Sequence, residues 1–232
     1  MTITDTVAVL ADTIAAAPQA AAPAATKTLS IWDLCVEGGY IMIPLAILSV
    51  ISIYIFIERA IVIARASRQD ATFMRRIRDY VYSEDFDAAK KLCASTDTPS
   101  ARLVAKGISR IGRPVADILT AIENTGNIEV ARLGKGLPWL ATTAAGAPML
   151  GFLGTVAGMV QAFFNLAEAG SGANIGVLAG GIYEALVTTV AGLIVGIIAL
   201  FAYNYLVARI NKVMTMLEGE TMEFMDMLND EN

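Results

Sequence analysis

The sequence predicts an all-α membrane protein with three transmembrane helices. Hydrophobic residues make up 56% of its 232 residues, which is more than in a typical soluble domain. They are concentrated in three blocks, and each block is long enough to cross a bilayer as a helix, which takes about 20 apolar residues. The blocks are Tyr40 to Ala64, Leu137 to Phe164 and Ile175 to Val207.

The positions of the basic residues predict how these helices are oriented. Nearly all Lys and Arg lie between Arg59 and Lys135, and Arg209 and Lys212 follow the third block. The connection between the second and third blocks has none. Because cytoplasmic segments are enriched in Lys and Arg, we expect the N-terminus outside and the C-terminus inside. The net charge of −5 argues against a nucleic-acid partner.

Together these observations divide the chain into seven predicted segments. Long helices are expected to extend from the membrane into a helical cytoplasmic region. The segments are a flexible extracytoplasmic tail (1–29), an interfacial helix with the first transmembrane helix (30–64), the helical cytoplasmic region (65–136), the second transmembrane helix (137–166), an extracytoplasmic turn (167–174), the third transmembrane helix (175–207) and a cytoplasmic C-terminal helix (208–232).

Two features are predicted before the first block. Residues 1–26 are rich in Ala but contain no basic residue, whereas a secretory signal begins with a positively charged region. A flexible or partly helical tail is therefore favoured over a cleaved signal. Ser30 to Glu37 is amphipathic, with Ser30 as a candidate N-cap and Trp32 as an interfacial anchor.

The cytoplasmic region is predicted to consist of several short helices. Ser83 is a candidate N-cap, Thr98 with Pro99 marks the start of a second helix, and Pro114 opens a third. The sequence has no Gly-rich phosphate loop, no paired catalytic carboxylates and no nucleophile elbow. These patterns indicate a helical scaffold and not an enzyme.

The second block combines a helix breaker with small residues. Pro148 is expected to kink or loosen the helix. Gly151, Gly154 and Gly158 let another helix approach closely. Thr155 lies among these glycines. A Thr in a membrane helix most often bonds the carbonyl four residues earlier, but its position where helices are closest also favours a functional role.

The third block contains a carboxylate, Glu184, well inside an apolar run. An acidic side chain in hydrocarbon costs several kcal/mol unless it faces protein or water. The residues alone leave two interpretations open, a structural carboxylate between helices and an ion-path residue. Small or polar residues recur at every fourth position, which predicts a ridge that packs against copies of the chain or a partner. This row is Gly176, Gly180, Glu184, Thr188, Gly192 and Gly196.

Metal and cofactor chemistry has little support in the sequence. The chain has no His and two Cys, Cys35 and Cys93, neither of which lies in a CxxC motif. The predicted topology puts these cysteines on opposite sides of the membrane. After the third block the chain is amphipathic and rich in Met, which favours packing between neighbouring subunits.

Three stretches of the sequence resemble the ExbB/TolQ/MotA proton-channel family. They are APMLGFLGTVAGMVQAF in the second block, GGIYEALVTTVAGLIVGIIALFAYN in the third, and FIERAIVIARAS at the end of the first. The order of the spans and the helical cytoplasmic insert are also similar to the family. The resemblance extends roughly from Ile31 to the end of the chain.

The resemblance implies a homopentamer whose second and third helices line a pore around an ExbD- or TolR-like single-span partner. In that family the partner carries the essential membrane Asp, and protons are the coupling ion without a further cofactor. Thr155 and Thr189 match the pore threonines, and Glu184 matches the pore glutamate. Thr188 is a second hydroxyl beside Thr189, and the resemblance leaves its role open. The residues themselves do not decide between H⁺ and Na⁺.

Three spans, a moderate cytoplasmic insert and an N-terminal extension favour the ExbB branch of this family. We therefore expect a multi-pass protein of the bacterial inner membrane that uses the proton motive force to energise TonB-dependent transport across the outer membrane. A TolQ-like motor with a TolA-like protein, serving envelope integrity, is the nearest alternative. A passive membrane scaffold is the alternative from a different class, and unlike a motor it would not respond to an uncoupler.

Overall fold

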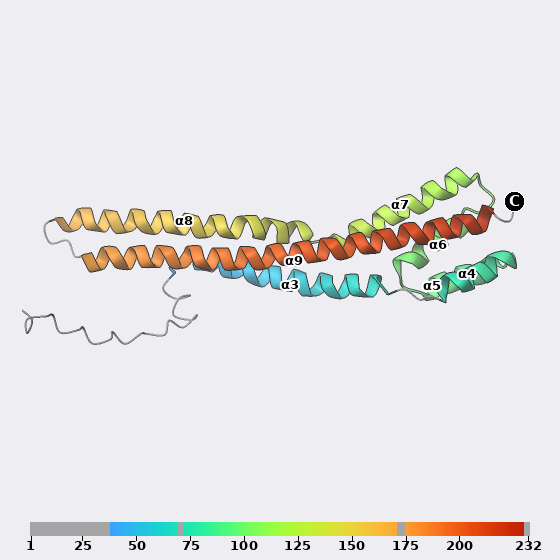
Figure 1. Ribbon diagram of the computed structural model, residues 1–232, viewed down its shortest axis with the longest axis horizontal. Helices are drawn as coiled ribbons and strands as arrows, with labels where there is room; N and C mark the ends of the chain where they lie inside the picture. The colour runs from blue at the N-terminus through green and yellow to red at the C-terminus, as the bar shows by residue number, and fades with distance from the viewer. Residues whose placement is uncertain (1–37, 69–71, 171–174, 230–232) are drawn as a thin grey trace, which may run out of the picture. The chain divides into compact units, whose positions relative to one another are not determined.

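The computed structural model describes residues 38–68, 72–170 and 175–229, and this part of the chain is built of helices without a strand. Three helices are long, and four shorter ones lie between the first and second of these (Figure 1). The predicted helix Ser30 to Glu37, with its cap Ser30, and the tail before it lie outside the described residues. The helices are α3 (Met42–Ala66), α4 (Phe73–Tyr82), α5 (Phe86–Ser95), α6 (Pro99–Ile108), α7 (Val115–Leu133), α8 (Leu137–Ala169) and α9 (Ile175–Asn229).

Three of the described helices, α3, α8 and α9, are long and apolar enough to cross a membrane. The predicted fold class, an all-α membrane protein with three candidate spans and further helices, is confirmed. α9 is a single helix of 55 residues, so the third span and the C-terminal helix are continuous. No Pro interrupts this stretch, and the backbone hydrogen-bond ladder can therefore run through the change from apolar to amphipathic sequence.

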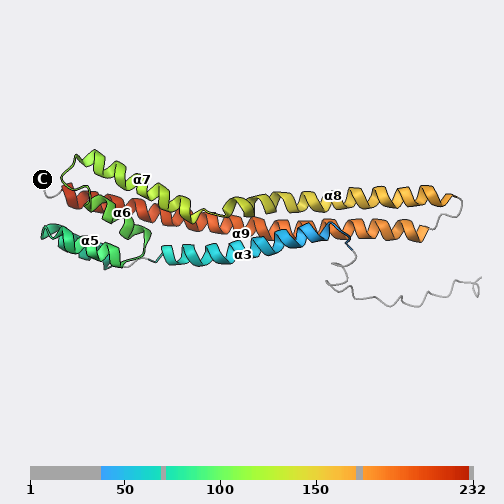
Figure 2. The same cartoon turned by 180° about the vertical axis from the view of Figure 1, so that it is seen from behind.

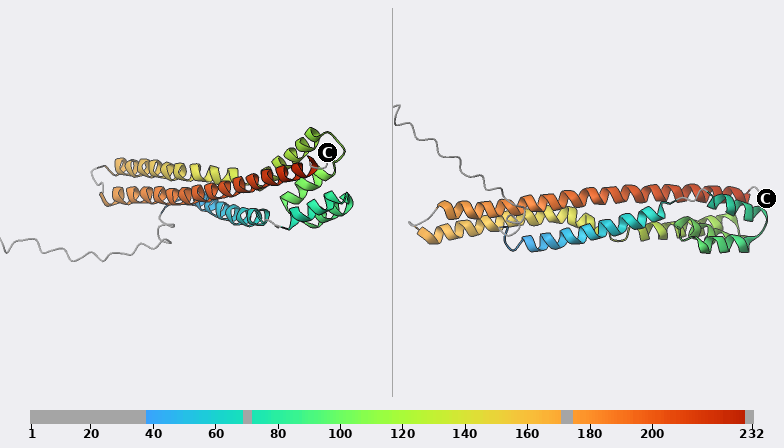
Figure 3. Two further views of the ribbon diagram at one scale, coloured as in Figure 1. Left: turned by 45° about the vertical axis from the view of Figure 1, so that its right-hand side comes forward. Right: turned by 90° about the horizontal axis from the view of Figure 1, so that it is seen from below.

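α8 and α9 lie side by side, joined by the short connection after Ala169 (Figures 1 and 3). Pro148 lies inside α8, and α9 provides a glycine where this proline ring approaches. A Cβ atom on Gly196 would lie 2.6 Å from the Cδ atom of Pro148, a separation that real Cβ atoms do not show. Gly196 is therefore required for α9 to pack over the proline.

α3 packs against the middle of α9 and does not reach its start (Figures 1 and 2). Ile41 and Leu45 form a small core with Ala147, against which Ala191 and Val195 of α9 pack. Further along, the rings of Phe56 and Tyr205 lie 6.2 Å apart. The ends of α8 and α9 nearest their connection therefore extend beyond the start of α3.

The short helices α4, α6 and α7 pack against the C-terminal half of α9, and α5 packs against α4 and α6. Phe224 and Val213 of α9 are fully buried there with Ile77 of α4 and Ile122 of α7. Thr98 caps α6 by accepting a hydrogen bond from the Ala101 N–H, with Pro99 as the first helical residue, as predicted. α7 begins directly after Pro114.

The cap predicted at Ser83 is wrong. Ser83 ends α4, and the side chain of Asp85 caps α5 by accepting a hydrogen bond from the Ala88 N–H at 3.0 Å. Between them Glu84 has a positive φ of 57°, a left-handed conformation that interrupts a right-handed helix. The new helix can begin only after that residue, which places its cap at Asp85.

In the described part of the predicted cytoplasmic region, one acidic side chain is buried. Glu129 of α7 is 4% exposed and accepts hydrogen bonds from Arg102 of α6 at 2.8 Å and from Arg132 at 2.9 Å. The guanidinium of Arg59, near the end of α3, donates to the Arg132 carbonyl at 3.2 Å. These contacts join three helices near the end of the first span.

Burial raises the pKa of the Cys93 thiol to about 11. The other cysteine, Cys35, lies outside the described residues.

Candidate functional site

The two threonines predicted at the pore, Thr155 of α8 and Thr189 of α9, are in direct contact. Their Oγ1 atoms lie 2.5 Å apart, and both side chains are half-buried. The carbonyl oxygen of Gly151 accepts hydrogen bonds from Thr155 at 3.2 Å and from Thr189 at 3.0 Å. The two spans therefore share a cluster of three oxygen atoms.

This cluster has fewer protons than contacts. Each Thr hydroxyl has one proton and two acceptor lone pairs, and a carbonyl oxygen only accepts. Two protons are thus available for three oxygen–oxygen contacts, so one contact at a time lacks a proton. Rotation of the two hydroxyls can therefore redistribute their protons among the three contacts while the oxygen atoms stay in place.

Glycines explain why the two hydroxyls are within reach of each other. A Cβ atom on Gly151 would lie 2.9 Å from the Thr188 carbonyl oxygen and 3.1 Å from the Thr189 Cα atom. On the facing helix, a Cβ atom on Gly192 would lie 2.6 Å from the Ala147 carbonyl oxygen. Only glycine lets the two backbones approach this closely. Because threonine side chains are short, their hydroxyls can meet only when the backbones are this close.

Thr188 is neighbour to the cluster but packs differently from Thr189. Its side chain is 3% exposed and donates to the Ala185 carbonyl of its own helix at 2.7 Å, with the Gly151 carbonyl oxygen at 3.5 Å. It fills the space where Gly154 has no side chain. The geometry is that of helix packing, with only a distant contact to the shared carbonyl.

Glu184 does not join the hydroxyl cluster. It lines a polar pocket of about 360 Å³ between the start of α3 and the two longer spans, and its carboxylate packs against Gly39. Gln161 and Asn165 line the same pocket and share a hydrogen bond of 2.9 Å. The pocket is therefore a second polar feature. Thr188, one helical turn from Glu184, also lines it, and it is open enough for Glu184 to be exposed.

The predicted packing glycines differ in what they meet. Gly151, Gly154, Gly158, Gly192 and Gly196 each face an atom of the other span at a distance that excludes a Cβ. A Cβ on Gly180 would meet nothing within 4 Å, and Gly180 lines the pocket instead. Gly176 is exposed in the first turn of α9.

Sequence reasoning missed Gly181, Gln161 and Asn165. A Cβ on Gly181 would lie 2.7 Å from the Ala162 Cβ, so the close approach of α8 and α9 continues at Gly181 and not at Gly180. Steps of exactly four residues drift by about 40° each, because a helix has 3.6 residues per turn. Alternating steps of four and three, starting from the Gly180–Gly181 pair, would have identified the contact face.

The described residues hold no group of three or more Cys, Asp or Glu side chains that could bind a metal ion. What the arrangement offers chemically is a pair of hydrogen-bonded hydroxyls between two spans and a carboxylate in a neighbouring pocket.

Comparison with known proteins identifies the family of this chain. The family model described as the MotA/TolQ/ExbB proton channel family matches residues 95–219, which include the hydroxyl cluster, Glu184 and most of α9. The chain belongs to this family. It is therefore a membrane proton-channel subunit of a motor.

Relatives in two branches of the family show similar identity. A putative biopolymer transport protein ExbB-like 1 of Synechocystis is 32% identical, with 79% of this chain and 73% of that protein covered. The biopolymer transport protein ExbB of Neisseria meningitidis is 31% identical over 72% of this chain and 80% of its own length. The Tol-Pal system protein TolQ of Haemophilus influenzae is 31% identical over 81% of this chain and 89% of its own.

Proposed function

We propose that the chain forms the channel wall of a proton-driven motor in the bacterial inner membrane and energises TonB-dependent transport across the outer membrane. Five copies would surround the single membrane helices of an ExbD- or TolR-like partner. The basic region between α3 and α8 would face the cytoplasm, in line with the enrichment of cytoplasmic segments in Lys and Arg. The coupling ion would be H⁺.

The contact between Thr155 and Thr189 is the observation that carries this proposal. A buried polar cluster in a membrane helix pair costs free energy unless its groups are hydrogen-bonded. Here two hydroxyls and a carbonyl satisfy one another across two spans. Such a cluster gives an acid on a partner helix something to exchange protons with, and an apolar helix pair would not.

Glu184 is proposed to act beside this cluster and not within it. Its carboxylate lies in the polar pocket with Gln161 and Asn165, so water can reach it without crossing the hydroxyl contact. The acid that binds and releases the transported proton would belong to the partner. Glu184 would then set the local charge along which protons approach.

The proposal is tested by removing the hydroxyls and keeping the shape. Thr155→Val with Thr189→Val replaces both hydroxyls by methyl groups, and we expect energy-dependent uptake of an iron chelate or vitamin to be lost while the complex still assembles. Thr142→Val is the matched control, because Thr142 is exposed on the same helix and bonds only the Pro138 carbonyl of its own helix, at 2.8 Å. Full uptake by the double variant would contradict the proposal.

Glu184→Ala is expected to abolish uptake in the same assay and to leave the complex intact.

An uncoupler added to cells with the unaltered chain separates a motor from a passive scaffold. A motor loses uptake when the proton gradient collapses, whereas a scaffold retains it. Replacing Na⁺ by K⁺ in the medium then identifies the coupling ion, and unchanged uptake is the result expected for H⁺.

A TolQ-like role in envelope integrity is the second candidate. It is favoured by the similarity to the Haemophilus influenzae TolQ, which covers a larger share of both chains than the Neisseria meningitidis ExbB does. Deleting the gene separates the two roles. Loss of iron-chelate uptake with an intact outer membrane supports the ExbB-like role, and leakage of periplasmic proteins with normal uptake supports the TolQ-like role.

A further inference from the structure

A groove lies between α7 and α9, at the end of α9 that is remote from the hydroxyl cluster. Its volume is about 290 Å³. The floor is apolar and buried, with Leu103 at 4%, Ile122 at 1% and Leu217 at 2% exposure. Met222 stands at the rim and is 68% exposed. A Met-rich apolar groove of this kind can adapt to the side chains of a bound helix or peptide.

The charge at the rim of this groove has one sign. Its charged lining residues are Glu123 of α7 and Glu218 of α9, and no Lys or Arg lines it. Both carboxylates are exposed, and neither forms an ion pair within the described part of the chain. After Lys212 the chain contains acidic residues and no basic one. The groove therefore complements a segment that is apolar and positively charged.

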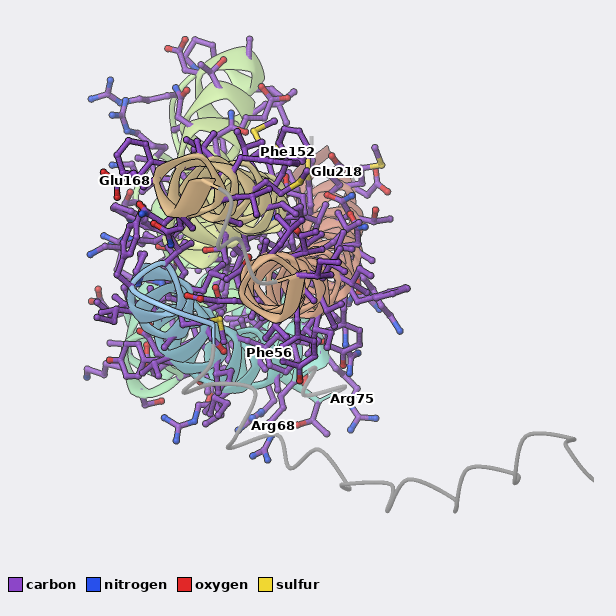
Figure 4. All side chains as sticks on the ribbon, turned by 90° about the vertical axis from the view of Figure 1, so that its left-hand side faces the viewer. Phe56, Arg68, Arg75, Phe152, Glu168 and Glu218 are labelled. Carbon is purple, nitrogen blue, oxygen red and sulfur yellow. The ribbon has the colours of Figure 1, made fainter. Side chains whose placement is uncertain are left out.

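The groove also continues the face of α9 that carries Thr189. Glu218 follows Thr189 by 29 residues, which is about eight full turns at 3.6 residues per turn, or about 44 Å. The two side chains thus project on the same side of the continuous helix. Thr189 contacts α8 on that side, and Glu218 lines the groove with residues of α7. α8 and α7 lie along the same side of α9 (Figure 1). In the end-on view, Glu218 lies at the edge of the molecule (Figure 4).

We propose that this groove binds the Lys- and Arg-rich cytoplasmic end of the single-span partner. The inference rests on the proposed function, in which the partner's span lies against Thr155 and Thr189. A single-span protein carries its basic residues on the cytoplasmic side of the span. Glu218, at the rim of the groove, lies 11 residues beyond Val207, the end of the predicted third span. This is about 17 Å along α9. About five extended residues cover that distance.

The consequence is a second attachment point for the partner, outside the membrane. Attraction between the basic tail and the two carboxylates would guide the tail into the groove, and the apolar floor would hold it. The tail would then stay bound to the groove of one subunit while the partner's span contacts the hydroxyl clusters. Charge on the groove would therefore affect how firmly the partner is held, without changing the groups that exchange protons.

Site-specific photo-crosslinking in the full-length chain tests this. Benzoylphenylalanine is placed at Met222, and the chain is expressed in cells that contain its own single-span partner. We expect a crosslink to the cytoplasmic tail of that partner, located by mass spectrometry of the joined peptides. Glu218→Lys should reduce its yield by about tenfold, as for an interface charge pair worth about 1.4 kcal/mol. Asp226→Lys, with the same charge change on an exposed residue of α9 outside the groove, should leave it unchanged.

Charge exchange provides the reverse test. Substituting Glu for the Lys or Arg identified in the crosslinked tail should restore the crosslink in the Glu218→Lys variant. Crosslinking of Met222 to a second copy of the chain would overturn the inference, because the groove would then be a contact between subunits. A partner that purifies with the complex without crosslinking would also overturn it and would leave the proposed function intact. If no single-span protein purifies with the complex, the proposed function itself fails.

Discussion

Gly180 and Gly192 lie a little more than about three turns apart on α9, and of the two only Gly192 meets another helix. A Cβ on Gly192 would contact the Ala147 carbonyl and the Gly151 Cα atom. Those are backbone atoms, which cannot move aside as the end of a flexible side chain can. A Cβ on Gly180 would stand in open space. The two glycines therefore allow the same substitution to be made with and without a steric conflict.

Gly192→Ala is expected to force α8 and α9 apart and to lower the free energy of unfolding by about 1–3 kcal/mol, the usual cost of overpacking. Gly180→Ala should be neutral or stabilising by up to about 1 kcal/mol, because Ala favours a helix more than Gly does. Thermal unfolding of the detergent-solubilised protein, followed by circular dichroism, measures both. Equal melting temperatures for the two variants would contradict the packing described above.

Among the short helices, the junction of α6 and α7 depends on a buried acid. Glu129 bonds Arg102 and Arg132, and Arg102 also bonds the exposed Asp97 at 2.6 Å. Burial acts to lower the pKa of Arg102, but hydrogen bonds and charges from Glu129 and Asp97 outweigh it and leave that pKa above its usual range. Arg102 therefore stays charged beside the buried carboxylate.

Arg102→Met removes one of the two partners of the buried carboxylate. We expect it to lower the free energy of unfolding by about 2 kcal/mol, less than for a fully unpaired buried charge because Arg132 remains. Asp97→Asn removes the other partner of Arg102. Because the Asp97 side chain is fully exposed, we expect this substitution to change stability much less than Arg102→Met does. Urea unfolding of the two variants in detergent compares them. A cost for Asp97→Asn as large as that for Arg102→Met would show that burial is not the cause.

α9 links the two ends of the subunit as an element. It is one helix from the polar pocket, past the hydroxyl cluster, to the acidic groove. A continuous helix resists bending because its backbone hydrogen bonds would have to lengthen. A displacement at Thr189 therefore moves the groove with it, and the two proposed contacts with the partner would act on the same rigid element.

Across the whole molecule, much apolar surface of the spans is exposed in a single chain. Phe152, Val160 and Phe163 of α8 and Phe201 of α9 are each more than half exposed, and Phe152 projects outward in the end-on view (Figure 4). Lipid covers such surface on the outside of a complex, and neighbouring subunits cover the remainder. The proposed pentamer provides both surroundings.

The purified complex in detergent is expected to have a protein mass of five chains. Multi-angle light scattering with separate refractive-index and absorbance signals measures that mass free of the detergent contribution. Adding the single-span partner should increase the protein mass of the complex without changing the number of copies of this chain in it. A complex of two or three chains would leave no central pore of five subunits and would contradict the proposed assembly.

The sequence by itself determined the three spans, because about 20 apolar residues in a row have few other stable locations. Of the three short-helix starts predicted from the sequence, the two at Pro99 and Pro114 are correct, because proline restricts where a helix can begin. Ser83 failed as a cap because the left-handed Glu84 cannot be recognised from residue type. Local patterns thus identify helices well and their exact limits less well.

Only the tertiary structure decided which small and polar residues meet. Thr155 and Thr189 were candidates because of a family resemblance, and their contact through the Gly151 carbonyl is visible only when α8 and α9 are packed. The same packing separates Glu184 from them and turns Gly181, not Gly180, toward α8. The reason is physical: the row of every fourth residue drifts by about 40° per step, and the angle at which two helices cross selects which part of that row faces the neighbour.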